Sequence, residues 1–134
     1  MNVAMLRVEG PEKSLGILKQ KLGLSVDVQW SAGEKRRDGA VRDSSGFNAT
    51  IADTEGMAEL TDTLRAFLAR CAAEAVVFPW LGVTAEIDIG FSVGDCNRFF
   101  GGFRLAAADL RACAQCGLDL SVTAYPTSDD ANGT

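Results

Sequence analysis

Residues 83–93 read VTAEIDIGFSV, and this stretch decides the fold that we predict. Apolar side chains occupy its odd-numbered positions, while polar, acidic or small residues occupy the even-numbered ones. Because successive side chains of a strand point to opposite faces, the pattern predicts a β-strand with one apolar face and one acidic face. The stretch is longer than a typical strand, so we expect a bend or bulge near Gly90.

Other stretches show either the same alternation or a helical spacing of apolar residues. Alternation predicts strands at residues 3–8, 24–31, 47–51, 99–105 and 118–124. Helical spacing predicts helices at residues 11–22, 54–71 and 109–115. Each helix carries one apolar stripe, which needs an apolar sheet face to cover. We therefore predict an α+β fold: a two-layer sandwich with three helices on one face of a mixed, largely antiparallel sheet of about six strands, in the order βαββαββαβ.

Three further expectations concern segments and boundaries. In residues 24–31 the alternation places Val28 and Trp30 on the apolar face, together with Leu24 and Val26. Residues 32–45 are charged and glycine-rich and predict an exposed loop, whereas residues 72–82 are apolar without a period and predict a cover over the core. We expect one domain over residues 1–125 and a disordered C-terminal tail over residues 126–134.

Composition limits the classes of function. The chain has 134 residues, a formal net charge of -5 and no histidine. Without histidine, Ser-His-Asp, Cys-His and histidine–metal mechanisms are excluded, and we predict no catalytic residue. The acidic balance disfavours nucleic-acid and anionic-membrane binding. The sequence shows no secretion signal and no apolar run long enough to cross a bilayer, so we expect a cytoplasmic protein with free thiols.

The cysteine pair Cys113 and Cys116 has the spacing of zinc and redox sites, but its context favours packing. The pair lies at the end of a predicted helix, whereas redox pairs use the thiolate-stabilising helix start. A structural zinc site would need a second matched pair, which Cys71 and Cys96 do not form. We expect buried thiols and no metal or cofactor, with zinc or redox chemistry as the alternative.

The predicted sheet has a polar face opposite the helices. If the apolar sets all point to the helices, this face collects Asp27, Gln29, Asn48, Thr50, Glu86, Asp88, Ser92, Arg104, Asp119, Ser121 and Tyr125. Glu86 and Asp88 are two residues apart on one strand, so their carboxylates could bind a hard cation or perturb each other's protonation. A merely solvated sheet face would have the same pattern.

The segment around residues 34–42 is rich in basic residues. Arg36 and Arg37 lie within it, and Trp30 stands just before it. Few aromatic residues interleave with the charges, so a charged, mobile hairpin is favoured over a nucleic-acid site. Trp30, Phe78 or Trp80 could also serve as contacts for self-association, which leaves a homodimer open.

Several short motifs together resemble a known family. They are WSAGE at residues 30–34, SGF at 45–47, IDIG at 87–90, and GL at 117–118 ahead of YP at 125–126. As a set they resemble the bacterial domain-of-unknown-function family 4279, over residues 3–126. The resemblance implies a small cytoplasmic α+β domain without an assigned activity, so no catalytic residues are carried over.

From these features we expect a non-enzymatic protein-binding module, of an immunity or regulatory type, whose acidic open sheet face meets a basic protein partner. The candidate binding residues are Glu86, Asp88, Asp27, Arg104, Tyr125, Trp30, Arg36 and Arg37. The alternative is a small-ligand or divalent-cation-dependent enzyme that uses the carboxylates of that face together with Arg104 or Tyr125.

Overall fold

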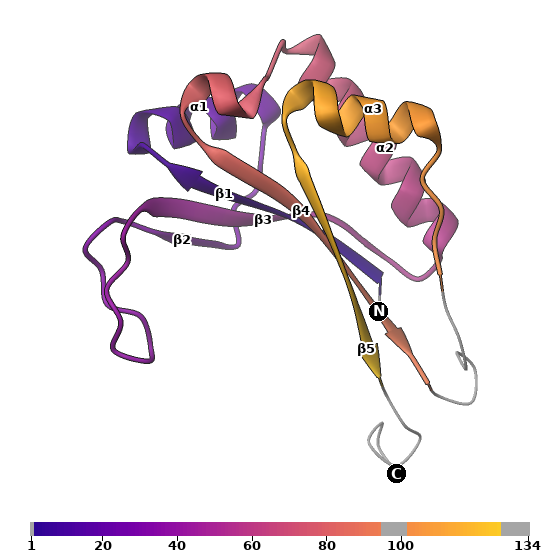
Figure 1. Cartoon of the computed structure of the whole chain (residues 1–134), viewed down its shortest axis with the longest axis horizontal. Coiled ribbons are helices and arrows are strands. Elements are labelled where there is room, and N and C mark those ends of the chain that lie inside the picture. Colours follow the sequence, from indigo (N-terminus) through magenta and orange to yellow (C-terminus); the bar gives the residue numbers. More distant parts are fainter. Residues whose placement is uncertain (1, 95–101, 127–134) are drawn as a thin grey trace.

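The computed structural model describes residues 2–94 and 102–126, which form a five-stranded sheet with three α-helices on one side of it (Figure 1). The strands are β1 (Asn2–Gly10), β2 (Val28–Trp30), β3 (Ser45–Thr54), β4 (Thr84–Val93) and β5 (Asp119–Pro126). The helices are α1 (Glu12–Leu22), α2 (Met57–Ala73) and α3 (Ala107–Cys116), with a short 3-10 helix, η1 (Phe78–Leu81), before β4. Among the described residues, no helix combines the length and the apolar character needed to span a membrane.

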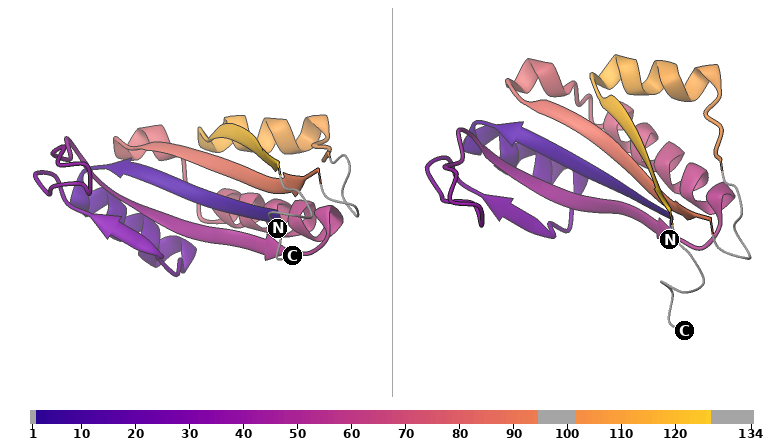
Figure 2. Two further views of the ribbon diagram at one scale, coloured as in Figure 1. Left: turned by 90° about the horizontal axis from the view of Figure 1, so that it is seen from below. Right: turned by 60° about the horizontal axis from the view of Figure 1, so that its bottom comes forward.

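The strands lie in the order β2-β3-β1-β4-β5, and Figure 2 shows them side by side. β3 and β4 each pair antiparallel with β1, β2 pairs antiparallel with β3, and β4 pairs parallel with β5. A parallel pair needs a crossover connection, and α3 lies in the connection from β4 to β5. The predicted α+β class, with three helices and a mixed sheet, is confirmed, but the described residues hold one strand fewer than expected.

The missing strand is the one predicted at residues 99–105. Residues 99–101 lie outside the described residues, and residues 102–105 form an irregular segment leading to α3. Phe103 and Leu105 pack against the core from this segment. The Phe103 and Phe91 rings lie edge to face, with 6.5 Å between their centres. The sheet position beside β4 belongs to β5. The alternation of Phe103 and Leu105 therefore reflects two contacts with the core and does not mark a strand.

The prediction for residues 24–31 has the wrong phase. Gln29 pairs with Phe47, which is fully buried under the helices, so Val28 and Trp30 point to the other face. Val28 is accordingly 53% exposed. Leu24 and Val26 do pack against the core, but from a segment that precedes the strand. Alternation fixes a face only within one continuous strand, and the irregular entry into β2 shifts the phase by one residue.

The core lies between the sheet and the helices, as the stripes predict. Its sheet side consists of alternate residues of the three inner strands: Ala4, Leu6, Val8, Phe47, Ala49, Ala85, Ile87 and Ile89. The segment predicted to cover the core does so, because Val76 and Phe78 are buried. Trp80 points outward and is 84% exposed.

Two local features shape the sheet and the packing of η1: a register shift between β1 and β3, and the glycine at position 117. The pairing of β1 with β4 has no bulge near Gly90, because the two strands keep one register from Asn2 opposite Phe91 to Glu9 opposite Thr84. The register shift lies instead between β1 and β3, at Ala4 and Met5. Gly117 ends α3 with φ 74°, and a Cβ atom there would clash with Pro79 Cδ. The glycine therefore lets η1 pack against the end of α3.

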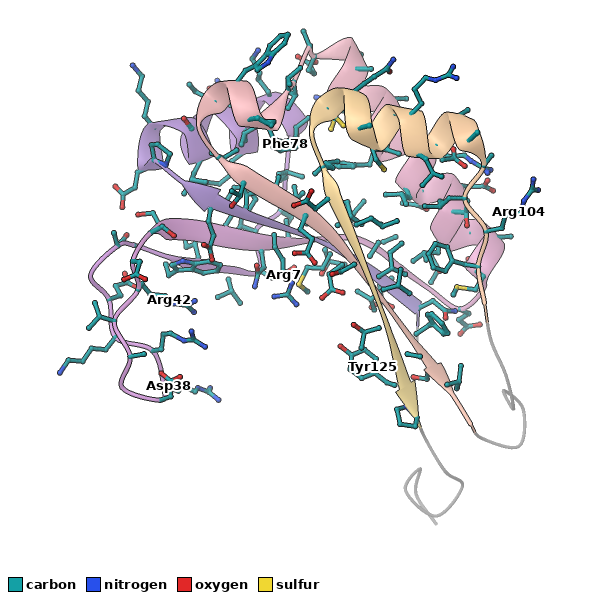
Figure 3. All side chains as sticks on the ribbon, viewed as in Figure 1. Arg7, Asp38, Arg42, Phe78, Arg104 and Tyr125 are labelled. Carbon is teal, nitrogen blue, oxygen red and sulfur yellow. The ribbon has the colours of Figure 1, made fainter. Side chains whose placement is uncertain are left out.

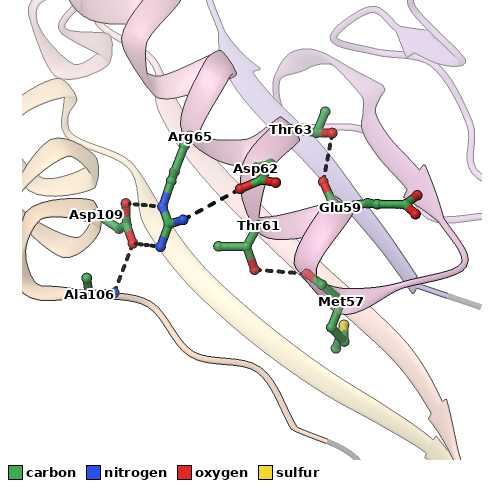
Figure 4. Close-up of polar contacts among 8 residues, drawn as sticks. All are labelled: Met57, Glu59, Thr61, Asp62, Thr63, Arg65, Ala106 and Asp109. Carbon is green, nitrogen blue, oxygen red and sulfur yellow. Dashed lines mark hydrogen bonds and ion pairs between the residues drawn. The ribbon is translucent and has the colours of Figure 1, made fainter.

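α2 and α3 are joined by a partly buried ion pair between Arg65 and Asp109 (Figure 4), and buried cysteines lie on both helices. Arg65 Nε and Nη2 donate to the two carboxylate oxygens of Asp109 at 2.9 and 3.0 Å. Asp109 Oδ2 also accepts the N–H of Ala106 at 2.9 Å, which caps the start of α3. Cys71, Cys113 and Cys116 are buried and free, as predicted, while Cys96 lies outside the described residues.

Residues 127–134, most of the predicted tail, also lie outside the described residues. Pro126 was predicted to belong to that tail but is the last residue of β5, where it pairs with Val93. The pairing with β4 extends the ordered chain one residue past the predicted domain boundary.

Candidate functional site

The side of the sheet away from the helices is the open face, and its side chains are arranged in rows by the strand register. Arg7 on β1 stands between Asn48 on β3 and Glu86 on β4, and Asp119 on β5 stands beside Glu86. Arg7 and Tyr125 both point to the side away from the helices (Figure 3). The centre of the open face thus carries a cation next to a pair of acids.

One hollow of the open face is strongly acidic, and we call it the acidic hollow. It has a volume of about 300 Å³ and is lined by Arg7, Glu9, Thr84, Ala85, Glu86 and Asp119. Three carboxylates line it together with a single guanidinium, which is itself paired with a fourth carboxylate, since Arg7 Nη2 lies 3.1 Å from Asp88 Oδ2. Because Arg7 is shared in this way, the hollow keeps an excess of negative charge.

A second hollow, the apolar hollow, adjoins the first through Arg7. It has a volume of about 260 Å³ and is lined by Val3, Met5, Arg7, Asp88, Gly90 and Tyr125. The Tyr125 ring lies directly over Gly90, where a Cβ atom would come within 2.9 Å of Tyr125 Cε2. Gly90 therefore lets the aromatic ring settle on the strand backbone, which is the close approach that a strand glycine often marks.

Asp27 belongs to the open face but is already engaged. Both the backbone N–H and the hydroxyl of Thr50 donate to Asp27 Oδ2, each at 2.7 Å. The backbone N–H of Asp27 donates to the carbonyl of Asn48 at 2.9 Å. These bonds fasten the start of β2 to β3, so Asp27 has a structural role.

The structure separates Arg104 from the other candidate residues. Arg104 lies beside α2 and α3, away from Arg7 and Tyr125 (Figure 3). There its charge helps to lower the pKa of Asp109. The prediction that Arg104 shares the open face is wrong, because residues 102–105 do not form the strand on which it was based.

Arg36 and Arg37 belong to a separate part of the surface, residues 31–44, which we call the basic hairpin, and Trp30 at the end of β2 lies at its base. Hydrogen bonds between backbone groups hold its two arms: Gly33 N–H to Arg42 O at 2.9 Å, and Arg36 N–H to Ala40 O at 2.7 Å. The Arg42 guanidinium lies 4.4 Å from the centre of the Trp30 ring at its base. The hairpin descends from the sheet edge on the side of the open face (Figure 1).

Arg7 and Glu9 are central to the open face but were not placed there from the sequence. Asp119 was placed on this face, as the structure has it beside Glu86, but was not among the candidate binding residues. The signal for Arg7 and Glu9 was present, since both alternate with the buried residues of β1. Their importance follows from β1 being flanked by β3 and β4, and strand order cannot be read from alternation. Of the proposed residues, the structure brings Glu86, Asp88 and Tyr125 together.

The groups whose pKa is shifted lie away from the open face. Hydrogen bonding by Arg65 holds the pKa of the Asp109 carboxyl below its usual range. The hydrogen bond with the Cys116 thiol, and then burial, raise the pKa of Cys71, and burial raises the pKa of Cys113. The lowered pKa of Asp109 reflects its ion pair with Arg65, which joins α2 to α3, whereas the raised pKa values keep the Cys71 and Cys113 thiols protonated. Among the described residues, no three His, Cys, Asp or Glu side chains are grouped to hold a metal ion.

Comparison of the chain with protein-family models, with curated proteins and with solved structures found no match. The resemblance to family 4279 therefore stays a prediction.

Proposed function

We propose that this chain is a non-enzymatic protein-binding module, of an immunity or regulatory type, whose open face receives a basic partner. The observation that carries the proposal is the acidic hollow, which Glu9, Glu86 and Asp119 line together with an arginine, Arg7, already paired with Asp88. A cationic side chain of a partner would find unneutralised carboxylates there. Charge complementarity of this kind accelerates encounter and selects partners by sign.

The form of the surface also supports binding of a protein. Both hollows are depressions in one sheet face, side by side across Arg7. Sites for small molecules usually enclose most of the ligand. The open face instead offers a broad surface with acidic and apolar parts, which suits a partner that contributes both cationic and apolar side chains.

The test is capture of a partner from the native host by three forms of the chain. The first is the unmodified chain, and the second carries Glu86→Lys with Asp119→Lys. The third, a matched control, carries Glu59→Lys with Glu74→Lys on or next to α2, so both variants have the same net charge. We expect the unmodified chain and the control to retain a basic protein that the second variant loses. Equal retention by all three would refute a role for the open face.

A second candidate function, binding of a small ligand, is favoured by the apolar hollow alone. Tyr125, Met5 and Val3 could hold an apolar body next to the Arg7–Asp88 pair. Thermal-shift screening with metabolites and divalent cations tests this function. A stabilising compound whose effect disappears in Tyr125→Ala would support it, and stabilisation unaffected by that change would place the ligand elsewhere.

A further inference from the structure

We infer that the basic partner of the acidic hollow is a second copy of this chain, docked through its basic hairpin. The inference rests on the proposed function, because it uses the same hollow and names its occupant. It would make the protein a symmetric dimer in which the two open faces look toward each other.

The charges of the basic hairpin are placed at its exposed end. Lys35, Arg36 and Arg37 follow one another and are all exposed. Glu34 and Asp38 flank them in sequence. The Asp38 carboxylate lies 3.8 Å from the Arg36 guanidinium, in an exposed pair of little strength. The chain as a whole is acidic, with 18 acidic and 13 basic residues, so three consecutive cations stand out against it. They are complementary to the acidic hollow.

Contacts with the sheet hold the basic hairpin in place, so its cations are carried by an ordered segment. Ser44 Oγ donates to Glu9 Oε2 at 3.1 Å, and Ala32 N–H donates to Ser45 Oγ at 2.9 Å, which ties both arms to the sheet. The stacking of Arg42 on Trp30 adds a third attachment. A segment that is already ordered loses less conformational entropy on binding than a free loop does.

The arrangement of the two surfaces permits a closed dimer. The basic hairpin and the open face lie on the same side of the molecule (Figures 1 and 3). A two-fold axis between two facing sheets would therefore place each hairpin over the acidic hollow of the other copy. The two contacts are identical, so the assembly is complete at two copies and leaves no unsatisfied site.

The same side of the molecule carries apolar groups that such an interface would bury. Val28 on the open face is 53% exposed, Val41 in the hairpin is 55% exposed, and Tyr125 is 45% exposed. Protein interfaces combine a rim of charges with a centre of apolar and aromatic side chains. Val28 and Tyr125 lie on the two edge strands, β2 and β5, so two facing sheets would bury apolar surface at both edges while the hairpin cations and the acidic hollow set the orientation.

The first measurement is sedimentation velocity of the full chain over a range of concentrations. It compares about 0.01 M with about 1 M NaCl, between which the Debye length falls from about 30 Å to about 3 Å. We expect a concentration-dependent dimer at the low salt and at least a tenfold weaker association at the high salt. A monomer at every concentration in low salt, or an association that ignores salt, would overturn the inference.

A charge exchange then tests the contact itself. One variant carries Arg36→Glu with Arg37→Glu, and the other carries Glu86→Lys with Asp119→Lys. Each variant alone would set like charges against each other, so each should be monomeric, with circular dichroism confirming that it is folded. In a mixture both contacts again join opposite charges, and the two variants should form a heterodimer. A mixture that stays monomeric, or a variant that still dimerises alone, refutes the contact.

The host-capture experiment separates this inference from the proposed function. If the unmodified chain is monomeric but captures a foreign basic protein through Glu86 and Asp119, the inference fails and the proposed function stands. If the chain dimerises as described and captures nothing else, the second copy is the partner. If the chain is monomeric and captures nothing through these residues, both fail.

Discussion

Replacement of Phe78 by alanine tests the role of η1 as a cover over the core. Phe78 is among the largest fully buried side chains of the chain. Its truncation removes the whole aromatic ring from the core and leaves a cavity, and changes of this kind cost about 3–5 kcal/mol. A domain of this size has a free energy of unfolding of about 5–15 kcal/mol, so the variant should fold but with much reduced stability.

Trp80→Ala is the matched control, because Trp80 is two residues away in the same 3-10 helix and is 84% exposed. Its removal should change the free energy of unfolding by no more than about 0.5 kcal/mol. Urea denaturation followed by far-ultraviolet circular dichroism measures both variants. With an m value of about 2 kcal/mol/M, a loss of about 4 kcal/mol lowers the midpoint by about 2 M.

Either of two outcomes would refute the assigned positions of Phe78 and Trp80. A Phe78→Ala midpoint within about 0.3 M of the unmodified chain, at the same m value, would mean that the ring does not lie in the core. A large loss in Trp80→Ala would mean that Trp80 is covered, by a second copy or by another part of the chain. Repeating the control at several protein concentrations separates these two explanations, because only a dimer depends on concentration.

Three further predictions concern the frame around the open face. Gly117→Ala should lower the free energy of unfolding by more than about 1 kcal/mol, because residue 117 has a positive φ and contacts η1. Gly16→Ala, exposed within α1 and without neighbours within 4 Å, should raise it by about 0.5–1 kcal/mol, and thermal unfolding compares the two variants. Because Arg65 lowers the pKa of Asp109, the stability that this carboxylate contributes is present above its unfolded pKa of about 3.9 and is lost as the pH falls through the folded pKa. Between about pH 5 and pH 2, the urea midpoint of Asp109→Asn should therefore fall less than that of the unmodified chain. In a variant lacking Cys96, the three buried thiols should react with a disulfide reagent only as fast as the protein opens, and rapid reaction in the folded protein would contradict their burial.

Alternation predicted the faces of β1 and β4 correctly because both are long and continuous. It failed at residues 24–31, where an irregular segment shifts the phase before β2 begins. It also failed at Phe103 and Leu105, which pack on the core without joining the sheet. At Phe103 and Leu105 the pattern was correct about contact with the core and wrong about the backbone conformation. In residues 24–31 it was correct about Leu24 and Val26 and wrong about Val28 and Trp30.

The candidate site was predictable in part for the same reason. Glu86, Asp88 and Tyr125 come together because β4 and β5 are adjacent and in register, and each residue alternates with apolar neighbours. Arg7 and Asp119 complete the acidic hollow, but their contribution depends on the order of strands in the sheet. That order is fixed by contacts between residues far apart in the chain, such as Arg7 and Asp88, which are separated by 81 positions. No local pattern contains this information.

The central position of β1 has a consequence for how the chain is made. β1 precedes every other element, yet it lies between β3 and β4, so neither of its edges can be paired when it leaves the ribosome. One edge of β1 stays unpaired until β3 has been synthesised, and the other stays unpaired until β4 has been synthesised. The pairing of β4 with β1 spans most of the chain. Formation of such distant contacts is slow, and an unpaired strand edge invites association with other chains. The emerging polypeptide should therefore depend on chaperones until residue 93 has been synthesised, and fragments that end before β4 should aggregate.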